Sequence, residues 1–415
     1  MRAQRCVGVS MRIGVDAACL ANGRGYGRFT RELLGALVES AREHQFVLYA
    51  DRASLTELPF DAANVRIVDV PQAVSPAHAA AADGYRSPAD MLRLTRAVWR
   101  DRPDVFWSPS VYTYFPLPPG QASLVTVHDT ITERFPELTM PSRRARLFWK
   151  AKVQLAIWQA TLVLTVSEFA AREIEEILGV PRDRLRVAGE AAARTFEPGT
   201  AEEAVAAARA AGVPEGTPWF TYVGGFTPHK YVDRIVRAHA VLVREAMSHR
   251  MPVPHLVLVG TTSADNFHGV GAGIHEAIAE CGTSDFVKWT GFMPDADLRH
   301  LLTGTRALLL PSENEGFGLP AVEAAACGAP VVATTASPLP QLLEGGGFFI
   351  APGDVDGLTT SMRALLDDGE RDRRGRVALE RAGRLTWRAS ARATLAALHD
   401  AVALARRVAP VPAVS

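Results

Sequence analysis

The regular alternation of short apolar runs with longer helical patterns is the feature that most constrains the fold of this chain. Strands that alternate with helices form parallel sheets covered on both faces. The runs are three to six residues long, bounded by turn residues and repeated in both halves of the chain. The predicted strands are Arg12–Ala17, Phe46–Ala50, Val65–Val70, Val105–Trp107, Ser123–Val127, Leu162–Val166, Arg184–Val187, Trp219–Gly224, His255–Val259, Val287–Thr290, Ala307–Leu310, Val331–Ala333 and Gly347–Ile350.

A chain of 415 residues is too long for one ordinary domain and suits two, each with its own core. An Ala-rich helical stretch flanked by Pro and Gly separates the halves, as is typical of a linker. We therefore expect two doubly wound Rossmann-like domains with an inter-domain cleft. Their predicted bounds are 11–195 for the N-terminal domain, 196–213 for the linker, 214–385 for the C-terminal domain and 386–407 for a terminal helix.

Composition excludes several classes of protein. The formal net charge is zero, which argues against broad electrostatic capture of nucleic acid. No run of eighteen apolar residues predicts a spanning helix, and the N-terminus lacks the apolar core of a signal peptide. The four cysteines are scattered, which favours a reducing cytoplasm. Because a good strand follows Met11, we expect the folded chain to begin there.

The stretch P-S-E-N-E-G-F-G-L-P-A-V-E-A, residues 311–324, places glycines and carboxylates where a predicted strand gives way to a helix. Pro320 suits the first helical turn, where its missing N–H costs nothing. Glu315 is then expected in the loop and Glu323 in the first turn. Gly316 and Gly318 leave backbone amides open at a helix start, which favours anion binding. Carboxylates beside an anion site fit a sugar nucleotide, although the helix dipole alone also favours an early glutamate.

The spacing of Glu315 and Glu323 resembles the E-x7-E signature of retaining family-4 glycosyltransferases of the GT-B fold. The resemblance implies that Glu315 contacts the transferred sugar and Glu323 the ribose. Glu313 is expected to be a solvated loop residue. The resemblance also implies that backbone amides of this loop face the phosphates and the sugar. They are the amides around Gly316, Phe317, Gly318 and Leu319.

A second glycine loop, V-G-G-F-T-P-H-K, follows the first strand of the C-terminal half. Gly224 and Gly225 end the strand, and Lys230 lies near a helix start, where an ammonium can neutralise phosphate. A solvated lysine is the alternative. The family commonly carries Arg-Lys-Asn here, and this chain has His-Lys-Tyr. We expect His229 to supply part of the missing arginine's charge.

The N-terminal half contributes a glycine cluster and a histidine. A dinucleotide fingerprint would need glycine where Arg28 stands. The cluster instead resembles the family's flexible loop over the diphosphate, which assigns Gly25, Tyr26 and Gly27 to the donor. T-V-H-D is typical of these enzymes, and the resemblance places His128 near the donor hexose. Asp129 is expected to orient the His128 ring or to cap the next turn, and capping is the more ordinary role.

Two D-x-D sequences, at residues 295–297 and 354–356, offer a metal alternative. Each precedes a helical pattern, so we interpret both as caps and predict no metal and no cofactor. The segment from Arg143 to Lys152 is rich in basic residues. It is either the exposed end of a core helix or a patch that meets anionic lipid or a phosphorylated acceptor.

Together with these motifs, the family resemblance implies a metal-independent retaining hexosyltransferase. The donor would be a nucleotide diphosphate sugar, with mannose as the favoured hexose, bound by the C-terminal domain. The acceptor hydroxyl would belong to a growing glycan, a glycolipid or lipid-linked sugar, or a glycosylated metabolite, bound by the N-terminal domain. We expect a cytoplasmic protein; if the segment from Arg143 to Lys152 is a lipid-binding patch, the protein would be peripheral to the inner face of the membrane. The alternatives are a GT-B nucleotide-sugar epimerase and a non-catalytic sugar-nucleotide binding module.

Overall fold

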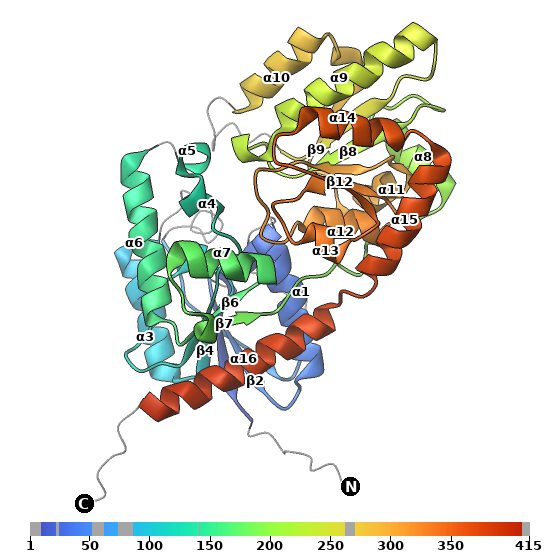
Figure 1. Cartoon of the computed structure of the whole chain (residues 1–415). Coiled ribbons are helices and arrows are strands. Elements are labelled where there is room, and N and C mark those ends of the chain that lie inside the picture. The colour runs from blue at the N-terminus through green and yellow to red at the C-terminus, as the bar shows by residue number, and fades with distance from the viewer. Residues whose placement is uncertain are drawn as a thin grey trace, which may run out of the picture. The chain divides into compact units, whose positions relative to one another are not determined.

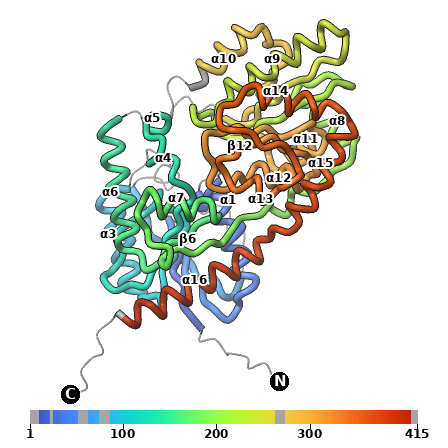
Figure 2. The backbone as a smooth tube through the Cα atoms, viewed as in Figure 1, coloured from blue at the N-terminus to red at the C-terminus, as the bar shows by residue number. Residues whose placement is uncertain are grey.

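The computed structural model describes residues 10–21, 25–51, 62–73, 86–140, 142–261 and 270–408, and the segment before residue 10 lies outside them. The chain divides into two compact units, each built on one parallel sheet (Figures 1 and 2). Unit 1 comprises Met1–Thr130, Ser142–Gly189 and Trp387–Ser415, and unit 2 comprises Ile131–Pro141 and Glu190–Thr386. No described helix is long and apolar enough to cross a bilayer.

Unit 1 contains a seven-stranded parallel sheet in the order β3-β2-β1-β4-β5-β6-β7. The order reverses between β1 and β4, and in such sheets ligands bind beyond the carboxyl ends of the strands at this point. The strands are β1 Arg12–Asp16, β2 Gln45–Ala50, β3 Val65–Asp69, β4 Val105–Ser108, β5 Ser123–Thr126, β6 Leu162–Thr165 and β7 Leu185–Val187. The longer helices are α1 Gly25–Ser40, α3 Pro88–Asp101, α6 Arg143–Gln159, α7 Glu168–Leu178 and α16 Trp387–Val408.

Unit 2 contains a six-stranded parallel sheet in the order β10-β9-β8-β11-β12-β13, which reverses between β8 and β11. Its strands are β8 Trp219–Val223, β9 His255–Val259, β10 Val287–Gly291, β11 Leu308–Leu310, β12 Val331–Thr334 and β13 Gly347–Ile350. Figure 1 shows α9, α10 and α14 on one side of this sheet and α11, α12 and α15 on the other. These helices span Val232–His249, Val270–Cys281, Val355–Ala364, Asp295–Gly304, Leu319–Ala326 and Asp368–Ala382.

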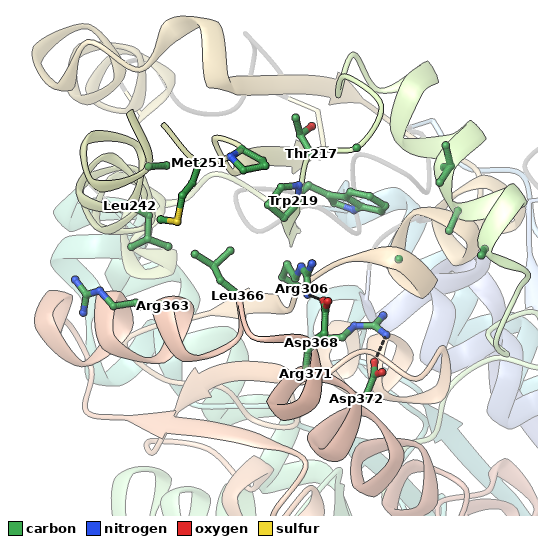
Figure 3. Close-up of a pocket in the computed structure, with 18 of the residues that line it drawn as sticks. Thr217, Trp219, Leu242, Met251, Arg306, Arg363, Leu366, Asp368, Arg371 and Asp372 are labelled. Carbon is green, nitrogen blue, oxygen red and sulfur yellow. Dashed lines mark hydrogen bonds and ion pairs between the residues drawn. The ribbon is translucent and has the colours of Figure 1, made fainter. Parts of the chain in front are cut away.

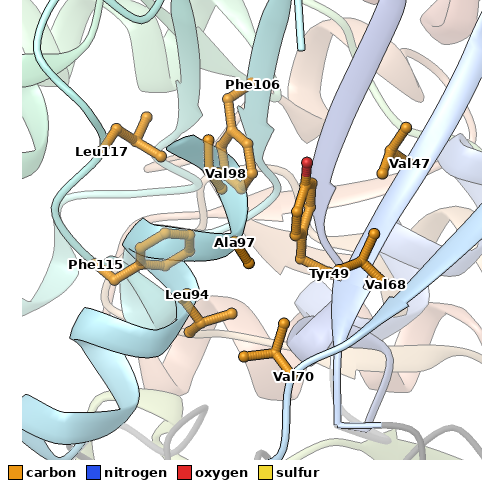
Figure 4. Close-up of a cluster of buried hydrophobic side chains, with 10 residues drawn as sticks. All are labelled: Val47, Tyr49, Val68, Val70, Leu94, Ala97, Val98, Phe106, Phe115 and Leu117. Carbon is orange, nitrogen blue, oxygen red and sulfur yellow. The ribbon is translucent and has the colours of Figure 1, made fainter. Parts of the chain in front are cut away.

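The thirteen predicted strands are all present, each within one residue of its expected ends, and two doubly wound sheets are confirmed. The reason is that the central strands are buried on both faces and therefore read as short apolar runs, whereas the edge strands β3 and β10 are only partly buried. In unit 1, one such face packs Tyr49 and Phe106 against Leu94 and Val98 of α3 (Figure 4). Ser87 caps α3 by accepting a hydrogen bond from the amide of Asp90.

The two units do not correspond simply to the two halves of the sequence, as the following helices show. Helix α16 belongs to unit 1, where it packs against α1 and strands β4 to β7. Helix α8 (Ala201–Ala210) lies in the predicted linker, opens with a capping box at Thr200 and packs against α11. The short helices α4 (Ile131–Arg134) and α5 (Pro136–Thr139) belong to unit 2, where α5 contacts the 3-10 turn η5, Pro228–Lys230.

Candidate active site

The glycine-rich loop after β11 leads into α12 at the carboxyl edge of the unit 2 sheet. Pro320 lies in the first turn of α12, as predicted. The helix begins one residue earlier than expected, at Leu319, because Gly318 adopts a left-handed conformation (φ +87°) and forms the N-cap. Glu323 is therefore in the second turn, and the prediction that it lies in the first is wrong. The helix dipole does not explain this buried carboxylate, since its effect is confined to the first turn.

The fold alone requires a glycine at position 318, whether or not the loop binds a ligand. A Cβ at this position would lie 2.7 Å from Cδ1 of Leu339, and few residues other than glycine accept its φ. The side chains of Phe317 and Leu319 on either side are buried. These two residues can therefore offer a ligand only their backbone.

An ion pair joins this loop to the loop after β8. The ammonium of Lys230 lies 2.6 Å from Oε1 of Glu315, and the side chains are 20% and 11% exposed. The hydroxyl of Ser312 donates to the same carboxylate oxygen at 2.6 Å, and the Glu315 amide donates to the carbonyl of Ala336 at 3.0 Å. Backbone and side chain thus fix the position of Glu315, and Lys230 is not a freely solvated lysine.

Glu313 is not a solvated loop residue, contrary to the sequence prediction. Its carboxylate accepts a hydrogen bond from the hydroxyl of Tyr231, and its amide donates to the carbonyl of His229 at 2.8 Å. Burial and the neighbouring Glu313 raise the pKa of Tyr231 to about 12. The guanidinium of Arg234 stacks 3.6 Å from the centroid of the Tyr231 ring. The sequence did not predict that Tyr231 and Arg234 belong to this group. The pattern that could have indicated them is an aromatic residue and a basic residue that follow Lys230 at the start of a helix.

His229 does not carry the charge that the sequence analysis assigned to it. Burial, reinforced by the positive charge of Lys230, lowers the pKa of His229 to about 3. Its Nε2 lies 3.3 Å from the hydroxyl of Thr227, and its Nδ1 is buried with no hydrogen-bond partner among the described residues. The ring can therefore offer a neutral nitrogen to a ligand but no positive charge.

The glycines after β8 lie at the same edge of the sheet. Gly224 has φ +154° and packs against Gly260, where a Cβ would lie 2.1 Å from the Gly224 carbonyl oxygen. Among the residues that the structure describes, no atom beyond its chain neighbours lies within 4 Å of a Cβ built on Gly225. In the loop after β10, Phe292 is 74% exposed, an aromatic that the sequence analysis passed over.

The unit 1 residues form a separate group at the carboxyl edge of their own sheet. His128 follows β5, with Nε2 3.0 Å from the carbonyl of Pro109 and its ring 4.7 Å from that of Phe29. Gly25, Tyr26 and Gly27 form the first turn of α1, so the prediction of a flexible loop at these residues is wrong. The turn is held because Gly27 and Phe29 are buried in the core.

Two family models match successive parts of the chain. "Glycosyl transferase 4-like domain" matches residues 24–189, and "Glycosyl transferases group 1" matches residues 206–380. The chain belongs to the group 1, GT4-like glycosyltransferases. This glycosyltransferase is 29% identical over 303 residues to the O-antigen chain mannosyltransferase B of Escherichia coli, covering 72% of this chain and 75% of the relative. It is 30% identical over 270 residues to a D-inositol 3-phosphate glycosyltransferase of Kribbella flavida, covering 63% of this chain and 61% of that relative.

Solved structures confirm the GT-B fold of this glycosyltransferase. Sucrose-phosphate synthase from Thermosynechococcus elongatus superposes with a TM-score of 0.70 at 19% identity, covering 94% of this chain and 98% of that one. HepE from Anabaena, solved in complex with UDP-glucose, gives 0.68 at 19% identity, covering 94% of this chain and 100% of that one. WaaG, involved in lipopolysaccharide biosynthesis, gives 0.68 at 16% identity, covering 93% and 98%.

The two D-x-D sequences of the glycosyltransferase differ in their roles. Asp354 is the N-cap of α14 and accepts a hydrogen bond from the amide of Gly357 at 2.8 Å, as predicted. Asp295 and Asp297 lie inside the first turn of α11, whose N-cap is Pro294, so neither is the predicted cap. Within the described ranges, no group of three or more His, Cys, Asp or Glu residues is placed to hold a metal.

Unit 2 also contains a cavity of about 900 Å³, whose lining is drawn in Figure 3. Trp219, the first residue of β8, and Arg306, which precedes β11, line it. It therefore opens at the amino ends of the strands, whereas Glu315 and Lys230 follow their carboxyl ends. Its arginines are paired with acids, as in Arg306–Asp368. This cavity is not part of the candidate active site.

Proposed function

We propose that this glycosyltransferase moves a hexose, with mannose as the favoured candidate, from a nucleotide diphosphate sugar to an acceptor hydroxyl, with retention and without a metal. The observation that carries the proposal is the Lys230–Glu315 ion pair beside the glycine loops at the switch point of the unit 2 sheet. The mannosyltransferase relative and the structural neighbour solved with UDP-glucose support such a donor. Neither finding supports an epimerase or a binding module.

In the proposed reaction, the bond from the anomeric carbon to the leaving diphosphate breaks, and a bond to the acceptor oxygen forms on the same face. The acceptor proton passes to the leaving phosphate oxygen. Lys230 stabilises the charge that develops on the diphosphate, since a fixed cation acts most strongly where charge builds up. The amides of Gly316 and Gly318 and the open backbone at Gly225 assist it.

The remaining roles are also proposals. Glu315 and His128 would position the hexose, and Glu323 would hold the ribose hydroxyls. The first turn of α1, Gly25–Gly27, would approach the diphosphate. Phe292 is exposed in the loop after β10 and offers a face on which a nucleobase could stack.

We further propose that the enzyme works in the cytoplasm, on a growing glycan, lipid-linked sugar or glycosylated metabolite, and contacts an anionic membrane through α6. The helix carries five basic residues and no acidic one. Its outer face exposes a ridge of large apolar side chains, while Trp149 and Val153 face the core. The ridge consists of Leu147, Phe148, Leu155 and Trp158, which are 53–80% exposed, and Arg143 and Arg144 are exposed beside it. Apolar anchors beside basic residues are typical of helices that lie in a membrane interface.

Sedimentation with vesicles tests this contact. The protein should bind vesicles of equal parts phosphatidylglycerol and phosphatidylcholine and bind pure phosphatidylcholine weakly. Replacing Arg143 and Arg144 by Ser should weaken binding about thirtyfold, at about 1 kcal/mol per basic residue. Trp158→Ser should also weaken binding, whereas Trp99→Ser, which removes an exposed tryptophan of α3, should not. Equal losses for the two tryptophan variants would refute the assignment to α6.

A panel of nucleotide diphosphate sugars, screened by thermal shift and then by turnover without acceptor, tests the donor proposal. A ligand that binds only the folded state raises the melting temperature, so the donor should stand out from the panel. The same sugar nucleotide should be slowly hydrolysed when no acceptor is present. Conversion to an epimer would favour the epimerase, and stabilisation with neither reaction would favour the binding module.

A further inference from the structure

A buried ion pair at the carboxyl edge of unit 1 anchors a group of residues that the proposed reaction does not use. Asp16, the last residue of β1, receives two hydrogen bonds from the guanidinium of Arg86, at 2.9 and 3.0 Å. Both side chains are almost completely buried. Arg86 also donates to the carbonyl of Thr113 at 2.9 Å and to the side chain of Gln72 at 2.6 Å. Its charge is therefore neutralised, and each of its three nitrogens donates to the protein.

Lys152, which lies on α6, is subject to the positive charge of Arg86 but has no such counter-charge among the described residues. Its ammonium lies 5.6 Å from the centroid of the Trp149 ring, and among the described residues no carboxylate lies within ion-pair distance of it. Burial, reinforced by the positive charge of Arg86, lowers the pKa of Lys152 to about 8. The aromatic contact does not offset this burial, since the pKa remains low. Among the described residues, Asp16 balances the charge of Arg86, and no carboxylate is paired with Lys152.

A row of aromatic rings connects Lys152 with His128. Trp149 contacts Tyr112, which follows β4, with ring centroids 4.7 Å apart. Tyr112 stacks on Tyr26 at 5.3 Å with an interplanar angle of 11°, and Tyr26 lies 6.4 Å from the ring of His128. The row therefore follows the carboxyl edge of the sheet, with an ammonium at one end and the histidine at the other.

We propose that unit 1 binds an acceptor that carries a phosphate group, which Lys152 holds at one end of the aromatic row while the attacked hydroxyl lies near His128. The inference rests on the proposed function, because His128 marks the reaction centre only if transfer occurs. A lysine suits phosphate as a compact point charge. The half-buried rings of Tyr112 and Tyr26 suit the apolar face of a sugar, whereas Trp149 is buried and supports the row from the core. The phosphate could be a free sugar's ester or the diphosphate of a lipid-linked sugar, which share this chemistry.

The chain has only four lysines, Lys150, Lys152, Lys230 and Lys288, so their ammonium groups can be observed individually. Reductive methylation with ¹³C-formaldehyde gives each lysine its own carbon resonance, and Lys→Arg variants assign them. The Lys152 resonance should titrate near pH 8 in the free protein. Inorganic phosphate should raise this midpoint, because an anion stabilises the charged form. Lys150, exposed on the same helix, is the internal control. No response of Lys152, or an equal response of Lys150, would overturn the proposal.

Acceptor kinetics provide the second test. A sugar acceptor and its phosphate ester are compared in the wild type and in Lys152→Met, which keeps the apolar stem. The preference for the phosphorylated acceptor in kcat/KM should fall at least tenfold, through KM, and Lys152→Arg should restore part of it. Gln154→Met, on the exposed face of α6, should preserve the preference. An equal loss for both acceptors would indicate a structural role and overturn the proposal.

The same comparison with a lipid-linked diphosphate sugar in detergent distinguishes the two sources of phosphate. A larger Lys152 effect on the lipid-linked acceptor assigns the site to a lipid diphosphate, and a larger effect on the soluble ester assigns it to a sugar phosphate. Absence of both transfer and donor hydrolysis in the wild type would refute the proposed function. The lysine resonances would still report phosphate binding in that case, so the two failures are separable.

Discussion

Replacing Glu315 by Gln should have opposite effects on two measurable properties: the binding of a nucleoside diphosphate and the rate of sugar transfer. In the structure the ammonium of Lys230 is paired with this carboxylate at 2.6 Å. A nucleoside diphosphate must compete with Glu315 for Lys230, and the carboxylate also repels its phosphates. A glutamine keeps the shape and still accepts the hydrogen bond from Ser312, but it releases the charge. We therefore expect Glu315→Gln to bind the nucleoside diphosphate more tightly while it transfers sugar more slowly.

The size of the first effect follows from the exposure of the pair. A hydrogen bond to a charged group contributes about 1.5–3 kcal/mol when it is protected from water. The Lys230 side chain is 20% exposed, so solvent screens part of this interaction. We therefore assign about 1 kcal/mol to the Lys230–Glu315 pair, which corresponds to about a fivefold lower Kd of Glu315→Gln for the nucleoside diphosphate. The second effect has the opposite sign because the sugar would lose the carboxylate that positions it.

Calorimetric titration with the nucleoside diphosphate of the best-stabilising donor measures the first effect, and turnover measures the second. Glu313→Gln is the matched control. It removes the same negative charge only two residues from Glu315, but the carboxylate of Glu313 is hydrogen-bonded to Tyr231 and not to Lys230. The difference between the variants isolates the pair with Lys230 from the general loss of negative charge. Weaker binding of the diphosphate by Glu315→Gln than by the wild type would refute this reasoning.

Three further predictions concern single side chains. Lys230→Met should lower transfer by about a hundredfold, and a chelator should leave the wild-type rate unchanged; loss of activity with chelator would indicate a metal. His229 has a folded pKa of about 3 against 6.5 for the free side chain, so its contribution to stability is complete above pH 6.5 and is lost as the pH falls toward 3. Denaturant unfolding should therefore show that the wild type loses about 2 kcal/mol more than His229→Gln between pH 8 and pH 5, and parallel losses would contradict this pKa. Asp354→Ala should destabilise unit 2 by about 1 kcal/mol through loss of the α14 cap, whereas Asp356→Ala, inside the first turn, should cost less.

The fold could be predicted because its information is local. Each central strand is a short run of apolar residues, such as Leu308–Leu310, that is buried on both faces. Pro320 marks the start of α12 because proline fits only the first helical turn. Periodicity and turn chemistry therefore determine both the elements and the edge of the sheet where a site belongs.

The errors arise where contacts distant in sequence decide the outcome. From the sequence, Glu313 is expected to be a solvated loop residue. In the structure it accepts a hydrogen bond from Tyr231, which lies in the loop after β8. His229 reads as a spare cation until burial beside Lys230 lowers its pKa. Gly25 and Gly27 read as a flexible loop because glycine disfavours helices, yet the burial of Phe29 in the core outweighs that preference. No local pattern carries these three outcomes.

The topology of the sheet explains why the Lys230–Glu315 pair forms at all. The two residues are 85 positions apart in sequence. Strands β8 and β11 are neighbours at the point where the order of the unit 2 sheet reverses, so the loops that follow them leave the same edge side by side. One loop brings open glycines and a lysine, and the other brings glycine amides at a helix start and a glutamate. A cation and a carboxylate placed this close neutralise each other, so the free site is nearly balanced in charge. A donor that supplies both diphosphate and sugar hydroxyls can satisfy the two partners separately, whereas a simple anion satisfies only Lys230, and this difference would favour sugar nucleotides over free phosphates.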